Sequence, residues 1–204
     1  MTLIEEAIVN FSKNRIKLSY FEDTEIFYKY IDNLIKPKQT VGVGDSVSFE
    51  EIGLYDYLRN LDINFLDKYN KELTKEEKKA LYINNFNSDI FFSGINALSS
   101  EGKIYNLDGN GSRVAPIIYG PKKVILVCGI NKLVKSEKEA LDRIKLKAAP
   151  LDAIRLNKKT PCVKTKICMD CKSPDKICNY MTVIQGQFDP DRIEILLINR
   201  ELGY

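Results

Sequence analysis

The chain has 204 residues, 44% hydrophobic and 29% charged, a composition typical of one globular domain that buries a sizeable core. Its 31 basic and 28 acidic residues give a net charge of +3, too balanced to indicate a nucleic-acid partner. No apolar run approaches the roughly 20 residues that cross a bilayer, and the N-terminus does not read as a signal peptide. We therefore expect a cytoplasmic protein without a membrane partner.

Histidine is absent from the sequence. Its absence removes the usual general base near neutral pH, the Ser-His and Cys-His nucleophile pairs, and histidine metal ligands. Any catalysis must therefore use Asp, Glu, Lys, Cys or Tyr, or a bound cofactor. The pattern leaves open whether the protein is an enzyme.

Helical and strand-like segments alternate along the chain, which predicts an α/β fold with a mostly parallel sheet. Ser or Thr followed three residues later by Glu marks helix starts at Thr2, Ser48, Thr74 and Ser136. We expect helices over 3–14, 24–35, from Ser48 onward, 75–84 and 137–147. Strands are expected over 16–21, 40–43, 63–66, 90–92, 123–127, 181–184 and 193–198. This divides the chain into an α/β core over 1–149, a cysteine-rich segment over 150–179 and closing strands of the same domain over 180–204.

A glycine-containing loop, Gly42 to Ser48, follows the predicted strand 40–43. Backbone N–H groups at the start of a helix form a ready anion site, so Gly42, Gly44, Asp45, Ser46 and Ser48 are candidate ligand-binding residues. The loop is neither a P-loop nor a complete dinucleotide fingerprint. The alternative is a tight turn that stabilises a strand–helix junction.

A second glycine-rich stretch lies between the strands 90–92 and 123–127. Pro116 falls in its expected helix, where an interior proline costs roughly 3 kcal/mol. The conflict disappears if Ser112 is the N-cap, because the N–H of the fourth helical residue has no partner within the helix. Arg113 then offers a fork for a carboxylate or phosphate. The candidate ligand-binding residues of this stretch are Asn96, Asp108, Gly109, Asn110, Gly111, Ser112 and Arg113.

Four cysteines, Cys162, Cys168, Cys171 and Cys178, follow one another with the spacing C-x5-C-x2-C-x6-C. Without a secretory signal such a cluster favours metal or redox chemistry over disulfides. Four thiolates complete a tetrahedral Zn²⁺ site or hold an iron–sulfur cluster, and we favour the cluster. A set of four unligated thiols is the alternative. Cys128, at a strand end, is expected to pack in the core.

Several of these blocks together suggest a family. The segments VGVGDS (41–46), SGINA (93–97), EGK (101–103), NLDGNGSRVA (106–115) and YGPKKV (119–124) resemble the LUD domain family, named for lactate utilisation. The segment from Thr160 to Asn179 resembles the cysteine-bearing tail of one branch of that family. The resemblance covers nearly the whole chain. It implies a three-layer α/β/α sandwich like ribose-5-phosphate isomerase and coenzyme A transferases, and a link to iron–sulfur redox proteins of lactate oxidation.

The resemblance gives less guidance on the reaction. Sugar-phosphate isomerases carry a Gly-Ala-Asp triplet with a catalytic carboxylate, and here Gly94-Ile95-Asn96 stands in that place. Coenzyme A transferases use a glutamate nucleophile, and Glu101 is the single glutamate of the central stretch, although we favour the alternative of a turn residue at the tip of a β-hairpin. Glu101 is the one candidate catalytic residue.

Three functions remain open from the sequence. The first is an accessory in lactate or related organic-acid oxidation that carries the cysteine site. The second is an enzyme or sensor for a small anionic ligand (a carboxylate, sugar phosphate or coenzyme A ester). The third is a non-catalytic assembly module with structural zinc. Homo-oligomerisation is left open.

Overall fold

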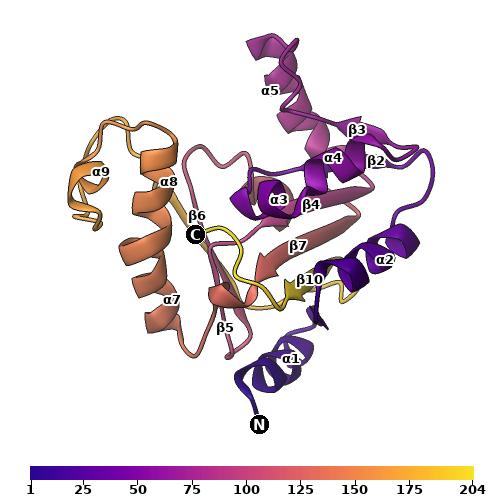
Figure 1. Ribbon diagram of the computed structural model, residues 1–204, viewed down its shortest axis with the longest axis horizontal. Helices are drawn as coiled ribbons and strands as arrows, with labels where there is room; N and C mark the ends of the chain where they lie inside the picture. The colour runs from indigo at the N-terminus through magenta and orange to yellow at the C-terminus, as the bar shows by residue number, and fades with distance from the viewer.

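The computed structural model describes residues 1–204 and is organised around a six-stranded sheet (Figure 1). Its order is β1-β10-β7-β4-β2-β3, and every neighbouring pair is parallel. The strands are β1 (Lys17–Phe21), β2 (Thr40–Val43), β3 (Asn64–Leu66), β4 (Ile90–Gly94), β7 (Lys123–Gly129) and β10 (Ile193–Ile198). The predicted parallel α/β sheet is thus confirmed.

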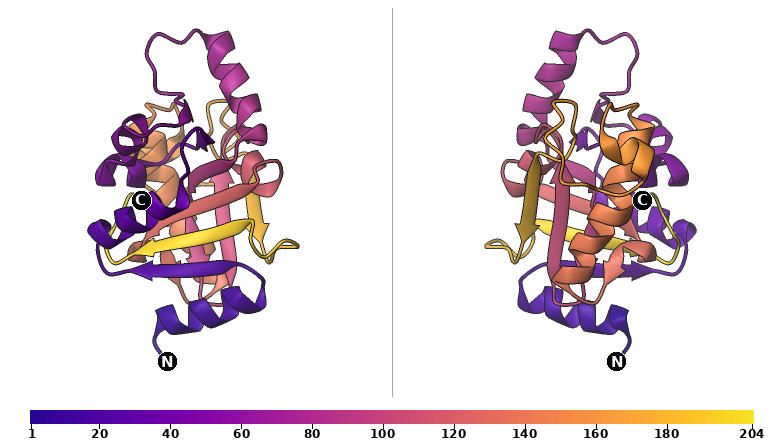
Figure 2. Two further views of the ribbon diagram at one scale, coloured as in Figure 1. Left: turned by 90° about the vertical axis from the view of Figure 1, so that its right-hand side faces the viewer. Right: turned by 90° about the vertical axis from the view of Figure 1, so that its left-hand side faces the viewer.

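Helices cover both faces of this sheet, which gives a three-layer α/β/α sandwich. One face packs against α2 (Thr24–Leu34), α3 (Val47–Ile52) and α4 (Leu54–Arg59), which bury Phe27, Ile31, Phe49, Leu54 and Leu58 against it. The other face packs against α1 (Leu3–Lys13) and α6 (Val114–Ile118). Figure 2 shows α1 lying along the β1 edge. Alternate side chains of each central strand enter opposite cores, as the period of two requires.

A second, four-stranded sheet of order β8-β5-β6-β9 lies in the outer layer. It comprises β5 (Ala97–Ser99), β6 (Lys103–Asp108), β8 (Leu133–Val134) and β9 (Tyr180–Ile184). The two predicted closing strands therefore separate. All six residues of β10 are buried in the large sheet, as its continuous apolar run favours, whereas β9 alternates exposed and half-buried residues at an edge.

A long helix follows β8 and differs from the prediction at its end. It runs as α7 (Glu137–Arg143), a π-helical turn (Ile144–Ala148) and α8 (Ala149–Arg155), so it passes through Pro150 and does not stop at 147. A π-turn breaks the regular i→i−4 pattern, and Pro150 sits near the start of the helical segment that follows it, where its missing N–H costs little. The cysteine segment begins after this helix with the short α9 (Pro161–Thr165).

The helix starts test the capping predictions. Thr2 and Thr74 form complete capping boxes with Glu5 and Glu77 before α1 and α5 (Lys75–Asn84), and Ser136 caps α7. The Ser48 prediction is wrong, because α3 starts at Val47 and Ser48 lies buried within it. No helix of the chain combines the length and apolar character needed to span a membrane.

Candidate functional site

A cavity of about 490 Å³ opens at the carboxyl ends of the central strands. Four parallel strands contribute residues just beyond their ends: Lys132 after β7, Asn96 after β4, Asp45 and Ser46 after β2, and Lys68 after β3. The loop after β6, the end of α8 and part of the cysteine segment form the remaining walls. Open α/β sheets bind their ligands at this edge.

Two glycines allow the loops at this edge to approach closely. A Cβ on Gly94 would lie 2.4 Å from Ser46 Oγ, and a Cβ on Gly44 would lie 2.9 Å from Arg113 Cγ. Larger residues would push the β2 and β4 loops apart. Gly42, in contrast, lies within β2 and does not line the cavity. A Cβ at this position would meet the side chain of Asn85.

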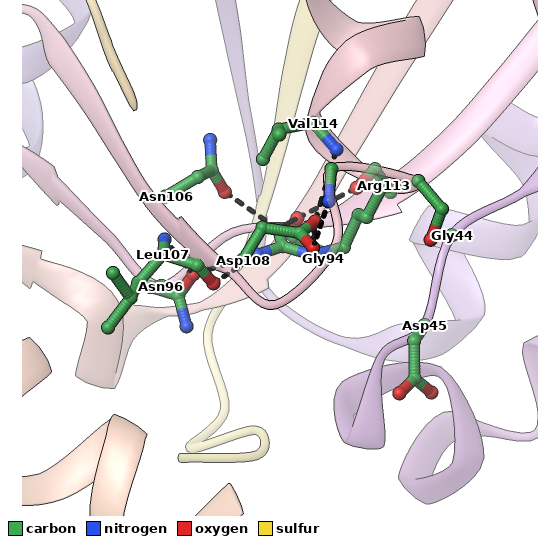
Figure 3. A network of polar contacts seen from close by, with 12 residues as sticks. Gly44, Asp45, Gly94, Asn96, Asn106, Leu107, Asp108, Arg113 and Val114 are labelled. Carbon is green, nitrogen blue, oxygen red and sulfur yellow. Dashed lines mark hydrogen bonds and ion pairs between the residues drawn. The ribbon is translucent and has the colours of Figure 1, made fainter. Parts of the chain in front are cut away.

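The loop after β6 is ordered by Asp108 (Figure 3). Its Oδ1 accepts hydrogen bonds from the backbone N–H groups of Asn110 (3.1 Å) and Gly111 (3.0 Å), and its Oδ2 accepts one from Val114 (3.3 Å). The carboxylate therefore holds the loop against the first turn of α6. The predicted N-cap at Ser112 is wrong by one residue, because α6 begins at Val114 after Arg113. Pro116 still falls in the first turn, as the prediction requires.

Arg113 uses its guanidinium within the protein (Figure 3). Nη1 donates to Gly94 O (2.9 Å) and Asn106 Oδ1 (2.7 Å), and Nη2 donates to Asn96 Oδ1 (2.9 Å) and Leu107 O (3.0 Å). Nε lies 3.7 Å from Asp108 Oδ2. These contacts take up the directions of its donors. Arg113 thus joins the end of β4 to β6 and is not the free fork that the sequence predicts.

Asp45 is held as a charged group on the opposite wall. It accepts hydrogen bonds from Tyr69 and from Arg155 Nη2 (2.9 Å). Burial alone would raise the pKa of Asp45, but Lys68, Tyr69 and Arg155 outweigh it and lower the pKa. An ionised carboxylate that is already paired is a poor general base, so Asp45 fixes the position of Arg155.

Two lysines face the cavity without a carboxylate partner. Lys132 is 5% exposed, and its Nζ lies 3.0 Å from Ser48 Oγ. Burial lowers the pKa of Lys132 to about 8, and Arg143 and Arg113 add to the shift. Burial likewise lowers the pKa of Lys68 to about 8, although Asp45 opposes it. Both lysines are missing from the sequence prediction. Their position directly after two predicted strands is the signal that could have found them.

The charged residues of the cavity do not balance. Six basic side chains line it against three acidic ones: Lys68, Arg113, Lys132, Arg155, Lys158 and Lys176 against Asp45, Asp108 and Asp152. Such an excess of positive charge in a concave site attracts anions. Of the predicted ligand-binding residues, Asp45, Ser46, Asn96, Asp108, Gly109, Asn110, Ser112 and Arg113 line the cavity. Ser48 does not line the cavity but accepts a hydrogen bond from Lys132, which does. Gly111 lies in the same loop and has a left-handed backbone conformation.

Glu101 lies away from this cavity. It is exposed at the tip of the β5–β6 hairpin, where the next residue, Gly102, packs against Asn10 and Asn14 of the α1 end. Glu101 is thus a hairpin turn residue, as the alternative interpretation expects, and a catalytic role at this cavity would have to come from another residue. The sequence alone did not show that Glu101 follows the end of β5 that points away from the cavity, whereas Asn96, before β5, lines it.

The four cysteines lie on one half-buried segment and are unpaired. Burial raises the pKa of Cys178, and the thiols of Cys168, Cys171 and Cys162 add to the effect. No three acidic or sulfur ligands are grouped as a metal ion requires. Lys158, Lys176 and Ile177 of the same segment form one wall of the cavity. Cys128 is buried in the core, as predicted.

The chain is thus a three-layer α/β/α domain with a basic cavity at the carboxyl ends of its central strands. The chain belongs to the LUD domain family, which it matches over residues 4–198, and is thus a lactate-utilisation-type protein. Its fold is similar to the crystal structure of a DUF162 family protein from Deinococcus radiodurans, with a TM-score of 0.52 and 12% identity over 96% of this chain and 94% of that one. At that identity the likeness concerns the fold alone. No curated protein matches the chain.

Proposed function

We propose that this protein binds a small anionic ligand in the cavity at the strand ends, as an enzyme or sensor of lactate or related organic-acid oxidation. The observation that carries the proposal is Lys132, an almost fully buried lysine with no carboxylate in ion-pair contact. An uncompensated buried charge is costly, and a bound carboxylate or phosphate would compensate it. Lys68, which lies near Asp45 but has no carboxylate within ion-pair distance, provides a second cation in the same cavity.

The candidate ligands are carboxylates such as lactate, sugar phosphates and coenzyme A esters. A thermal-shift panel of these compounds tests the proposal, with each variant compared against its own ligand-free form. We expect at least one class to stabilise the wild type and the shift to be lost in Lys132→Met and Lys68→Met. Lys138→Met, on the exposed face of α7, is the matched control. A panel without any stabilising anion would contradict the proposal.

The cysteine segment supports a second proposal, a four-cysteine iron–sulfur or zinc site held by Cys162, Cys168, Cys171 and Cys178. Thr160 is the single buried residue between 157 and 179. The segment could therefore move to bring the four thiols together without breaking contacts in the hydrophobic core. Neighbouring lysines would offset the negative charge of four thiolates. A cluster would supply electron transfer with iron–sulfur partners, whereas zinc would favour an assembly role.

Metal analysis of protein purified without oxygen tests this site. We expect one metal or cluster equivalent per chain, lost in Cys168→Ser and Cys171→Ser and retained in Cys128→Ser. Visible absorbance would assign iron–sulfur, and stoichiometric zinc without colour would assign the assembly module. Protein free of both metals would contradict a site built from these four thiolates.

A further inference from the structure

The amine of Lys132 stands in an unusual position for a surface-loop lysine. The chain leaves β7 at Gly129, where a Cβ would lie 2.2 Å from Arg200 O, and turns through the 3-10 segment Ile130–Lys132. The close approach tucks Lys132 beneath the C-terminal residues, so that its Nζ lies 3.4 Å from the Cβ position of Gly203. The side chain therefore lines the cavity from a desolvated wall.

The groups around this amine do not favour a permanent ammonium. Ser48 Oγ is its one hydrogen-bond partner, at 3.0 Å. The nearby Arg143 donates to Asn131 O (2.9 Å) and Asn96 O (2.6 Å) and has no carboxylate in ion-pair contact. Glu51 is the carboxylate whose charge most affects the pKa of Lys132, and it accepts a hydrogen bond from Gly203 N (2.7 Å). Cys128 is buried and its pKa is raised to about 12, so its thiol stays neutral.

A desolvated lysine beside other cations is the arrangement that activates lysine nucleophiles. We propose that Lys132 forms an imine with a ligand that carries both an aldehyde or ketone and an anionic group. The inference rests on the proposed function, because the remaining cations of the cavity must hold the carboxylate or phosphate of that ligand. Lys68 and Lys176 are available for this role, since both line the same cavity and neither has a carboxylate within ion-pair distance.

The step balances without a redox partner. The neutral amine attacks the carbonyl carbon, a C–N bond forms, and the carbonyl oxygen takes up a proton to give a carbinolamine. A second proton, taken from solvent in the open cavity, protonates the carbinolamine hydroxyl; nitrogen then expels it as water, the C–O bond breaks, and the C–N bond becomes an iminium. The hydroxyl of Ser48, 3.0 Å from Nζ, is placed to relay the first of these protons, because it can accept the proton from nitrogen while it donates its own proton to the carbonyl oxygen. Water leaves through the open cavity.

The other basic residues of the site fit this role less well. Arg113 is fully engaged and does not act as a nucleophile. Lys158 pairs with Asp175 at 3.3 Å. The negative charge of Asp45 raises the pKa of Lys68 and so favours its ammonium form over the neutral amine. Burial leaves the neutral amine fraction of Lys132 near pH 7 roughly a few hundredfold larger than that of an ordinary surface lysine, a gain that Lys68 shares.

Reductive trapping tests the inference on the full chain. Glyoxylate, a small aldehyde acid, is added with cyanoborohydride, and the product is analysed by intact mass and peptide mapping. We expect one carboxymethyl group per chain at Lys132 and at least tenfold less labelling at the exposed Lys138. Lys138→Arg should label as the wild type does. Lys132→Arg, which keeps the cation, should lose the adduct.

A thermal shift with acetate or phosphate, which lack a reactive carbonyl, separates the two proposals and reports whether Lys132→Arg is folded. Stabilisation by these anions without an adduct at Lys132 would overturn the imine and leave anion binding standing. Neither stabilisation nor adduct would overturn both. Equal labelling of many lysines, or an undiminished adduct in Lys132→Arg, would also overturn the imine.

Discussion

Replacing Arg113 by alanine tests whether this residue holds the site together or binds the ligand. The Arg113 side chain is 12% exposed, and its guanidinium donates to two backbone carbonyls and two amide oxygens. In Arg113→Ala these four acceptors lose the guanidinium, and Asp108 loses its cationic neighbour. Gly94 O keeps a donor in Ser93 Oγ, and Asn96 Oδ1 keeps one in Leu107 N–H. An unpaired buried acceptor costs about 1–3 kcal/mol, but water entering from the cavity will satisfy part of the set.

We therefore expect Arg113→Ala to lower the free energy of unfolding by about 3–5 kcal/mol, the range for breaking a buried charged network. Arg113→Lys should lose less but remain below the wild type, because a lysine cannot reach four acceptors at fixed positions. Denaturant unfolding followed by far-UV circular dichroism measures both. Lys122→Ala, which breaks an exposed pair with Asp89, is the control and should cost about 0–1 kcal/mol.

The result that would refute this reasoning is an Arg113→Ala protein within about 1 kcal/mol of the wild type that no longer responds to ligand. Arg113 would then be a free ligand-binding group, as the sequence indicates, and its contacts in the structure would contribute little. Loss of stability together with retained ligand response would support the positioning role most strongly.

Three further predictions address other parts of the chain. Lys132→Met should be more stable than the wild type by about 1–3 kcal/mol at pH 7, and the gap should shrink between pH 8 and 10.5. The pKa of Lys132 is lower in the folded than in the unfolded protein, so between these two values the unfolded wild type binds more protons and the stability of the wild type rises with pH. A stability difference between Lys132→Met and the wild type that does not change with pH would contradict this. Gly42→Ala places a Cβ 2.3 Å from Asn85 Oδ1 and should cost about 1–3 kcal/mol, whereas Gly109→Ala, whose nearest contact is 3.5 Å, should be nearly neutral; equal costs would contradict the packing. Glu101→Gln should leave stability within about 0.5 kcal/mol and ligand response unchanged, and a lost response would restore its candidacy.

Local patterns predicted the layers of this fold well. The apolar run 193–198 forms a strand buried on both faces, and the Thr2 and Thr74 boxes cap helices as their side chains require. These features depend on neighbouring residues alone. The passage of the long helix through Pro150 was not predictable in this way, because it depends on a π-helical turn.

The site was predicted in outline and missed in its chemistry. The loops around Asp45 and Asp108 do meet at one cavity, since parallel strands bring their carboxyl ends to one edge. The sequence could not show that Arg113 turns inward to four acceptors, because those acceptors belong to β4, β6 and their loops. Nor could it show that Lys132 is buried without an acid, which depends on residues distant in the chain.

A crystal structure with the best anion of the thermal-shift panel tests the central claim most directly. The account predicts electron density for its carboxylate or phosphate inside the cavity, with an oxygen within hydrogen-bond distance of Lys132 Nζ or Lys68 Nζ. The four contacts of Arg113 should be unchanged. An anion bound outside the cavity, or one held by Arg113 after it has left Gly94 and Leu107, would contradict the account.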